Sequence, residues 1–373
     1  MSRIAHINAG LHLNRQERLT IIITIIVTIV AGILTVLNAN AVLIFVVTAA
    51  ALALLAGLVG QATDQIGSHL GSGATGVLQS ALGNLPELFV GIFALRAGLL
   101  AVVQAALVGS ILGNSLFVLG LAFFIGGLRN GTQRFKSDTP RMIANLTLLA
   151  VAALAVPTLV YGLHTPAAGH EEGLGIACAI ILLVVFIASI PFSLKGEPLG
   201  VSPEVKEILK EQEQEQEAPV SWPIWLAVIV LVGAGVGSAF VSDWFVSSLT
   251  PAITFLHISP AFTGLVIVAI AGNAVENVVG IQFAARNQMD YAISVILNSS
   301  LQVALGLIPV LVLLSFVIGG AHLTLVLAPL LVAALGLTAI LSTVIIYDGE
   351  STWLEGLVLM GLYGIIAVSF WWG

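Results

Sequence analysis

Long apolar stretches separated by short polar segments run along almost the whole chain. A transmembrane helix needs about 20 mainly apolar residues, and eleven stretches approach or exceed that length. The regular alternation of polar and apolar positions that is typical of a membrane β-barrel is absent from them. The pattern predicts an all-α polytopic membrane protein with helices near residues 19–37, 41–61, 74–95, 99–126, 142–162, 174–194, 222–247, 260–285, 291–318, 322–346 and 352–372.

The composition agrees with this pattern. Of the 373 residues, 58% are hydrophobic and only 8% are charged, and the mean hydropathy is +1.10. A soluble domain carries roughly a quarter charged residues. No loop is long enough for a catalytic domain and no nucleophile with an adjacent base stands out, so an enzyme is not expected. No cofactor and no nucleic-acid partner are expected either. The expected partners are the lipid bilayer and small ions, and a homo-oligomer is left open.

The positive charges predict the orientation in the membrane. With a cytoplasmic N-terminus, Arg96 is the one Lys or Arg residue of the twelve that falls on the outer side. Such an asymmetry follows the positive-inside rule, and it predicts an outer C-terminus and a multi-pass protein of a prokaryotic cell membrane. The residues on the cytoplasmic side are Arg3, Arg15, Arg18, Arg129, Arg134, Lys136, Arg141, Lys195, Lys206, Lys210 and Arg286.

Two short polar motifs interrupt the apolar runs, "GNLPE" at residues 83–87 and "GNAVE" at residues 272–276. The two motifs align at an offset of 189 residues, which matches their glycines, their asparagines and their glutamates. Matching Asn, Glu and Ser in register indicates an internal repeat. The matched pairs are Gly83 with Gly272, Asn84 with Asn273, Glu87 with Glu276, and Ser110 with Ser299.

The topology of the repeat follows from counting helices. The two motifs lie on the third and eighth predicted spans, five spans apart; this number is odd, so the halves run in opposite directions through the membrane. Inverted repeats with a site near the midplane are the usual plan of secondary transporters. The predicted organisation is 1 + 5 + 5 helices. The expected parts are an N-terminal helix (1–38), a first five-helix repeat (39–195), an acidic cytoplasmic linker (196–220) and a second five-helix repeat (221–373). The acidic linker is either a solvated spacer or a patch that concentrates cations.

The two glutamates predict an ion-binding site. A charged carboxylate in hydrocarbon costs at least ~2.5–3.5 kcal/mol, so a matched pair, Glu87 and Glu276, is better explained by a shared cation or proton site than by two structural glutamates. Asn84 and Asn273 lie three residues earlier, on the same helix faces. Ca²⁺ prefers oxygen ligands, whereas zinc and copper favour sulfur or imidazole. The neighbouring spans add Gln104, Ser110, Asn114, Ser115, Ser294, Asn298, Ser299, Ser300 and Gln302.

The backbone near the motifs has special residues. Pro86 lacks an N–H donor, so it is expected to release the carbonyl oxygen of Leu82 and to bend the third span. Gly83 and Gly272 allow close approach of backbone. The eighth span has no proline, so the two halves need not break alike. Two carboxylates can hold either one Ca²⁺ or two protons, and this competition predicts an exchanger with 1:2 as the simplest stoichiometry.

At these residues the chain resembles the Ca²⁺/H⁺ exchanger (CAX) family of the calcium:cation antiporter superfamily. The resemblance rests on both motifs, on "GSILGN" and "NSSLQVAL", on the acidic linker and on the tail "YDGESTWLEGLVLMGLYGIIA". It implies that Glu87 and Glu276 are the central Ca²⁺/H⁺ carboxylates. It further implies flanking roles for Asn84, Asn273, Ser110, Ser299, Ser300 and Gln302, and acidic residues on gating helices at Asp64 and Asp243.

The predicted function is therefore a secondary antiporter that exchanges Ca²⁺ for H⁺ by alternating access. Two positions depart from the family pattern: Asn298 stands where the family favours Gly, and Leu85–Pro86 replaces a frequent Ala-Thr. A proline before the glutamate resembles the sodium/calcium exchanger branch, so a Na⁺/Ca²⁺ exchanger is the alternative. A divalent cation channel is less favoured, because the duplicated inverted site lies within one chain whereas channel pores are usually oligomeric rings.

Overall fold

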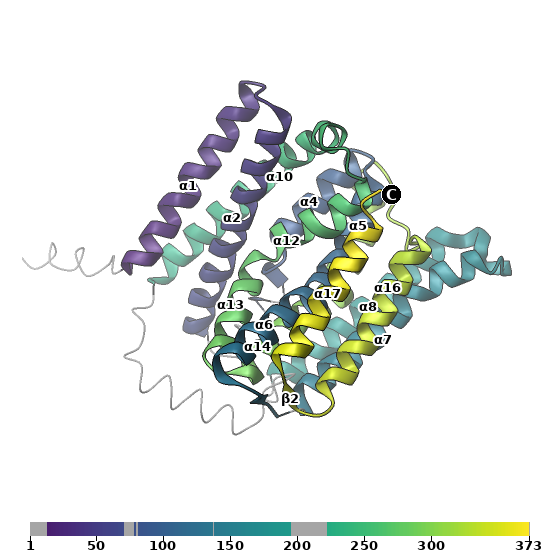
Figure 1. Ribbon diagram of the computed structural model, residues 1–373. Helices are drawn as coiled ribbons and strands as arrows, with labels where there is room; N and C mark the ends of the chain where they lie inside the picture. The colour runs from purple at the N-terminus through teal and green to yellow at the C-terminus, as the bar shows by residue number, and fades with distance from the viewer. Residues whose placement is uncertain (1–12, 71–77, 80, 137, 195–221, 373) are drawn as a thin grey trace, which may run out of the picture.

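The computed structural model describes residues 13–70, 78–79, 81–136, 138–194 and 222–372. Long helices run side by side through the molecule, with α1 at one edge and α7, α8 and α16 at the opposite edge (Figure 1). The acidic linker predicted at 196–220 lies outside the described residues, as does the first part of the third predicted span, at 74–77.

The helices follow the order that the hydropathy pattern predicts. In the described residues they are α1 (Arg15–Val36), α2 (Ala41–Leu70), α4 (Leu85–Arg96), α5 (Leu100–Leu112), η1 (Gly113–Val118), α6 (Leu119–Asn130), α7 (Asp138–Gly162), η2 (Pro166–His170), α8 (Glu171–Leu194), α10 (Ile224–Leu256), α11 (Pro260–Phe262), η3 (Thr263–Val268), α12 (Ala269–Gly272), α13 (Ala274–Ala285), α14 (Met289–Gln302), η4 (Val303–Leu307), α15 (Ile308–Ser315), α16 (Pro329–Ile346) and α17 (Trp353–Ser369).

The described residues contain fewer helices that can each cross a membrane than the eleven spans predicted. Within the described part of the chain, eight helices are individually long and apolar enough to cross a membrane. A ninth span is a pair, Pro260–Gly272 and Asn277–Ala285, bent by 65°. Two further predicted spans contain only shorter helices, α4 and α17. The all-α fold is confirmed, whereas helix length alone does not establish the count of eleven.

The core is built where helices from the two halves meet. Along α2 and α10, the rings of Phe45 and Phe245 stack with centroids 5.2 Å apart. A Cβ added at Gly237 would lie 3.1 Å from Leu55, so the two helices also pack closely further along. By contrast, α1 buries only Thr24 and Ala31. Its isoleucine-rich remainder is exposed, as expected for a helix that faces lipid on most sides.

A second close crossing joins α5 to η3. A Cβ at Gly109 would lie 2.2 Å from the carbonyl oxygen of Leu265, and one at Gly264 would lie 2.3 Å from that of Val102. Small residues let membrane helices approach to backbone contact. Because η3 continues into α12 and α13, this crossing fixes the position of the second motif.

Two short strands were not predicted. β1 (Gln133–Arg134) and β2 (Glu350–Ser351) pair antiparallel. They join the segment after α6 to the turn before α17, and Arg134 forms an ion pair with Glu350 at 3.0 Å. The backbone N–H of Glu350 donates to Asp348 Oδ1 at 3.1 Å. The acidic "DGE" segment is therefore a turn whose side chains are used in local contacts.

Candidate ion-binding site

Both motifs break their helices in the same way. Asn84 precedes α4 with φ −95° and ψ 21°, and Asn273 precedes α13 with φ −95° and ψ 20°. These angles lie near the bridge region between helix and strand, which is sparsely populated and frequent in active sites. Each break is followed by a helix of 12 residues. The matching backbone angles at Asn84 and Asn273 support the internal repeat.

The break does not require a proline. Pro86 lies in the first turn of α4, where its missing N–H costs little because the first helical N–H groups have no intrahelical partner. The second motif breaks identically without a proline. The second motif was expected to be free to break differently, yet both helices break at the Gly-Asn pair that the two motifs share.

The repeat extends to the neighbouring spans. The π-helical turn η1 covers Gly113–Val118, and η4 covers Val303–Leu307. Adding the repeat offset of 189 to the bounds of η1 gives 302–307, which coincides with η4 to within one residue. π-Helical turns occur frequently at functional sites, because they displace side chains and free backbone groups.

The first glutamate lies against the second motif. Glu87 occupies the first turn of α4, where the positive end of the helix dipole favours a carboxylate. A Cβ added at Gly272 would lie 2.7 Å from Glu87 Cγ and 2.8 Å from Oε1. Only glycine leaves room for the carboxylate at this point. The Glu87 side chain thus lies against the backbone of the second motif, and the two motifs meet there.

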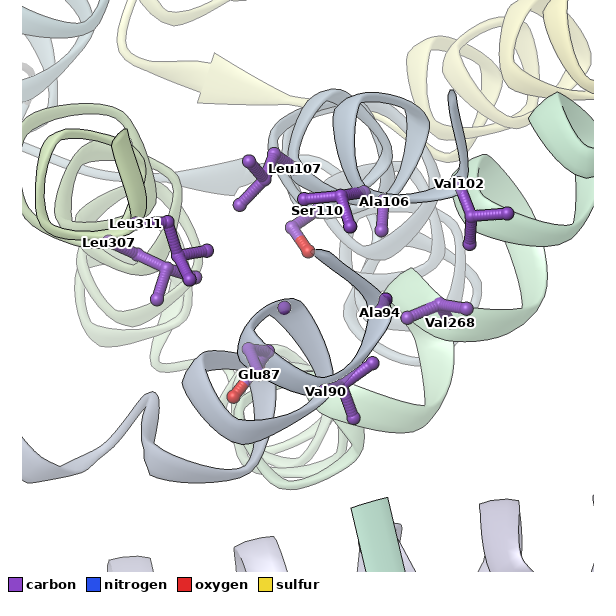
Figure 2. Close-up of a pocket in the computed structure, with 12 residues that line it drawn as sticks. Glu87, Val90, Ala94, Val102, Ala106, Leu107, Ser110, Val268, Leu307 and Leu311 are labelled. Carbon is purple, nitrogen blue, oxygen red and sulfur yellow. The ribbon is translucent and has the colours of Figure 1, made fainter. Parts of the chain in front are cut away.

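The space around Glu87 is narrow. One cavity of about 20 Å³ lies between α4, α5 and α15, and another of about 10 Å³ lies between Leu52, Phe245 and Gly272. A volume of ~10–15 Å³ is enough for one water molecule. Figure 2 shows Glu87 and Ser110 on opposite walls of the larger cavity, with Leu307 and Leu311 to one side. A cation that enters either cavity must have lost most of its hydration shell.

A buried hydrogen-bond network surrounds the second asparagine. Asn273 Nδ2 donates to Ser110 Oγ at 3.0 Å and to the carbonyl oxygen of Ala269 at 3.1 Å. Asn273 Oδ1 accepts from Ser299 Oγ at 3.2 Å and from Asn114 Nδ2 at 3.4 Å. Asn114 also donates to Ser299 Oγ at 2.9 Å. Asn273 is only 1% exposed, so this network joins three spans in the interior.

A second contact across the repeat lies beside the network. The hydroxyls of Ser115 and Ser300 are 3.1 Å apart, and both side chains are buried. Sequence reasoning placed Ser300 at the site but left Asn114 and Ser115 as general oxygen donors. The spacing of Asn114, four residues after Ser110 on one helix face, is the signal that links it to the site.

The two repeats differ in the hydrogen bonds around their motif asparagines. Asn84 is half-buried, and its side chain has no hydrogen bond within the described residues. The counterpart of Asn114 in the repeat is Val303, which offers no polar group. The network around Asn273 therefore has no equivalent around Asn84, and the site is symmetric in backbone but asymmetric in hydrogen bonding.

The remaining predicted residues fall into two groups. Glu276 lies in α13, one turn beyond the break, but its side chain is outside the described residues, and Gln302 ends α14 directly before η4. Neither acidic residue assigned to gating lies beside Glu87. Asp64 is twelve residues beyond Leu52 on α2, roughly 18 Å along the helix, and Asp243 is exposed on the side of α10 away from the cavity.

The network predicts unequal effects for the two asparagines. We expect Asn273→Ala to lower thermal stability clearly, because it removes the donor to the buried Ser110 hydroxyl and the acceptor of the buried Ser299 hydroxyl, at about 1–3 kcal/mol for each group left unsatisfied. Asn84→Ala is the matched control and should cost much less. Thermal unfolding of the two purified variants tests this, and equal losses would contradict the assigned asymmetry.

Two inverted repeats of broken helices, with a carboxylate and amide groups at their meeting point, define a secondary cation transporter. A profile of the sodium/calcium exchanger protein family matches residues 40–195 and 226–372, and the chain belongs to this family. The predicted resemblance is thereby confirmed, and the family is one of transporters.

Individual relatives agree. The chain is 36% identical over 342 residues to a Ca²⁺/H⁺ antiporter of Synechocystis sp., covering 88% of this chain and 90% of the relative. It is 33% identical over 327 residues to the Ca²⁺/H⁺ antiporter ChaA of Bacillus subtilis, with coverage of 88% and 91%. The solved structure of native YfkE superposes with a TM-score of 0.78 at 29% identity, over 94% of this chain and 99% of that one.

Proposed function

We propose that this protein is a Ca²⁺/H⁺ antiporter that works by alternating access, with Glu87 and Glu276 binding either Ca²⁺ or protons. The observation that carries the proposal is the contact of Glu87 with Gly272, which brings the motifs of both repeats to one point. The names of the relatives, Ca²⁺/H⁺ antiporters at 33–36% identity over most of the chain, support the same activity.

The donor set suits a hard cation. Around Glu87 the described side chains offer amide and hydroxyl oxygens, and the end of α12 leaves backbone carbonyl oxygens without intrahelical partners. Ca²⁺ takes six to eight such oxygen ligands at about 2.3–2.6 Å. In this proposal Asn84, Asn273, Ser110, Ser299, Ser300 and Gln302 line the site, and Gly83 and Gly272 provide the backbone room.

Exchange follows from charge. Two carboxylates with Ca²⁺ bound, or with two protons bound, are neutral as a unit, and a neutral unit can be enclosed in an apolar interior at far lower cost than an empty, doubly negative one. The cavities beside Glu87 hold about one water each. Such a closed site can open to the other side only when one of its two substrates has neutralised it.

The wider arrangement is proposed on the same basis. The parts are an N-terminal helix, two five-helix repeats at 39–195 and 221–373, and an acidic cytoplasmic linker at 196–220. The charge asymmetry supports a cytoplasmic N-terminus and an outer C-terminus, in a prokaryotic cell membrane. Asp64 and Asp243 keep the gating roles that the family resemblance implies, and Pro86 is assigned to gating because of its place at the start of α4. No resident cofactor is proposed, since Ca²⁺ and H⁺ are substrates.

A Na⁺/Ca²⁺ exchanger is the second candidate. It is favoured by one observation in the chain, the proline directly before Glu87, and the family profile bears that exchanger's name. The two candidates share the fold and the paired site, so only the driving ion separates them.

Everted vesicles with an acid interior and a pH-sensitive dye test the proposal. We expect added Ca²⁺ to collapse the pH gradient in the absence of Na⁺, because Ca²⁺ displaces protons from the site. If Ca²⁺ enters only against Na⁺ and leaves the pH gradient intact, the protein is a Na⁺/Ca²⁺ exchanger and the proton proposal is wrong. Vesicles without the protein provide the baseline for dye response.

A further inference from the structure

A long apolar groove lies between α4 and α10, and the predicted orientation places it toward the outer side of the membrane. It has a volume of about 760 Å³, within the ~300–1,000 Å³ that is usual for small-molecule sites. Aromatic and small side chains are among the groups that line it. Among the residues that line it are Phe89 and Phe93 of α4 and Gly235, Ala239 and Phe240 of α10.

The groove and the ion site share one helix. Residues on one face of α4 line the ion cavity, and residues on the opposite face line the groove. Because α4 begins at the break after Asn84, it is held mainly by what packs against these two faces. An occupant of the groove therefore presses on the helix that carries Glu87. The faces are Glu87, Val90, Gly91 and Ala94 toward the ion cavity, and Leu85, Phe89, Phe93 and Arg96 toward the groove.

One base and one acid lie at the outer end of the groove. Arg96 and Asp243 both line it and both are exposed. Among the described residues, neither side chain has an ion pair or hydrogen bond with another side chain. Arg96 is nine residues beyond Glu87, roughly 14 Å along α4. Half the hydrocarbon thickness is about 15 Å, so a midplane Glu87 puts Arg96 at the outer interface.

We propose that this groove binds one acyl chain of a zwitterionic phospholipid of the outer leaflet. Its phosphate pairs with Arg96 and its ammonium group pairs with Asp243. The lipid supports α4 and thereby holds Glu87 against Gly272. The lipid site itself stands apart from the transport activity, and only this effect on Glu87 rests on the proposed function.

The dimensions favour an acyl chain over a protein segment. From Leu85 to Arg96 the groove follows α4 for roughly 16 Å, about the depth of one leaflet. A helix about 10 Å in diameter would occupy roughly 1,300 Å³ over that length, so it would need all of the empty space of the groove, about 1,280 Å³, including the part that is open to the surroundings. The groove also borders exposed apolar residues of α10, Val232 and Val236, so a chain from the bilayer can enter sideways.

The test uses the full-length protein, delipidated in detergent, and counts bound lipids by native mass spectrometry. Phosphatidylethanolamine and the anionic phosphatidylglycerol are added separately. We expect the wild type to retain one phosphatidylethanolamine at least about tenfold more tightly than phosphatidylglycerol. Equal retention of both lipids would overturn the pairing of the headgroup with both charges.

Matched variants locate the site. At Gly235 an added Cβ approaches only Leu85, at 4.0 Å, so Gly235→Phe fills the groove and should abolish the bound lipid. Gly233→Phe is the control, because Gly233 lies on the same helix outside the groove with nothing within 4 Å. Arg96→Gln and Asp243→Asn alter only exposed side chains and should each weaken retention about tenfold.

Three outcomes would overturn the proposal. They are unchanged lipid binding in Gly235→Phe, unchanged binding in both charge variants, and a Gly235→Phe protein that changes from an oligomer to a monomer, which would make a second copy the occupant. Lipid counts and Ca²⁺-driven proton flux are measured separately. A wild type without flux would refute the proposed function, while the lipid count would still decide the groove.

Discussion

We expect Glu87→Gln to abolish Ca²⁺-driven proton exchange. The amide keeps the size of the side chain in its narrow cavity and removes its charge. A pair of unit charges 4 Å apart is worth about 4 kcal/mol at an effective dielectric constant of about 20, which corresponds to a loss of roughly a thousandfold in affinity. Glu276→Gln should have a comparable effect, because the repeat gives both carboxylates the same role.

The measurement combines the dye assay in everted vesicles with Ca²⁺ binding to the purified variant. Glu17→Gln is the control: Glu17 caps α1 through its side chain, and Gln serves equally well in a capping box. This control should exchange at the wild-type rate. Normal exchange by Glu87→Gln would show that the Glu87 carboxylate does not hold the transported ions.

The sequence predicted the backbone of the site better than its hydrogen bonds. The two motifs mark both breaks, but the sequence assigned a bend only to Pro86 in the third span, whereas both helices break at the Gly-Asn pair that the motifs share. The repeat suggested that Asn84 and Asn273 are equivalent. Their surroundings differ because Asn114 has Val303 as its counterpart, a difference visible in the sequence only once the partner of Asn273 is known.

The face of α10 on which Asp243 lies could not be predicted from hydropathy. Hydropathy located α10, but it did not give the rotation of the helix about its axis. Once Phe245 is known to face the cavity beside Glu87, Asp243 must face away, since two residues along a helix turn the side chain by about 200°. The strands β1 and β2 were missed for another reason: two-residue strands have no periodicity to detect.

We expect Gly264→Ala to destabilise the protein strongly. The new methyl group would lie 2.3 Å from the carbonyl oxygen of Val102 and 2.9 Å from Ala105 Cβ. Backbone atoms cannot rotate away as side chains do, so α5 and η3 must separate. Overpacking in a well-packed core costs about 1–3 kcal/mol and sometimes more, and here the contact on the other side, at Gly109, would be loosened as well.

Gly233→Ala is the matched control, because a methyl group there meets nothing within 4 Å and Ala favours helix over Gly by about 1 kcal/mol. Thermal unfolding should place Gly264→Ala well below the wild type and Gly233→Ala at or above it. Since η3 leads directly into α12, the same displacement would move Gly272 away from Glu87 and reduce transport in protein that remains folded. Equal stability of the two variants would mean that the α5–η3 crossing tolerates a wider spacing and does not fix the position of the second motif.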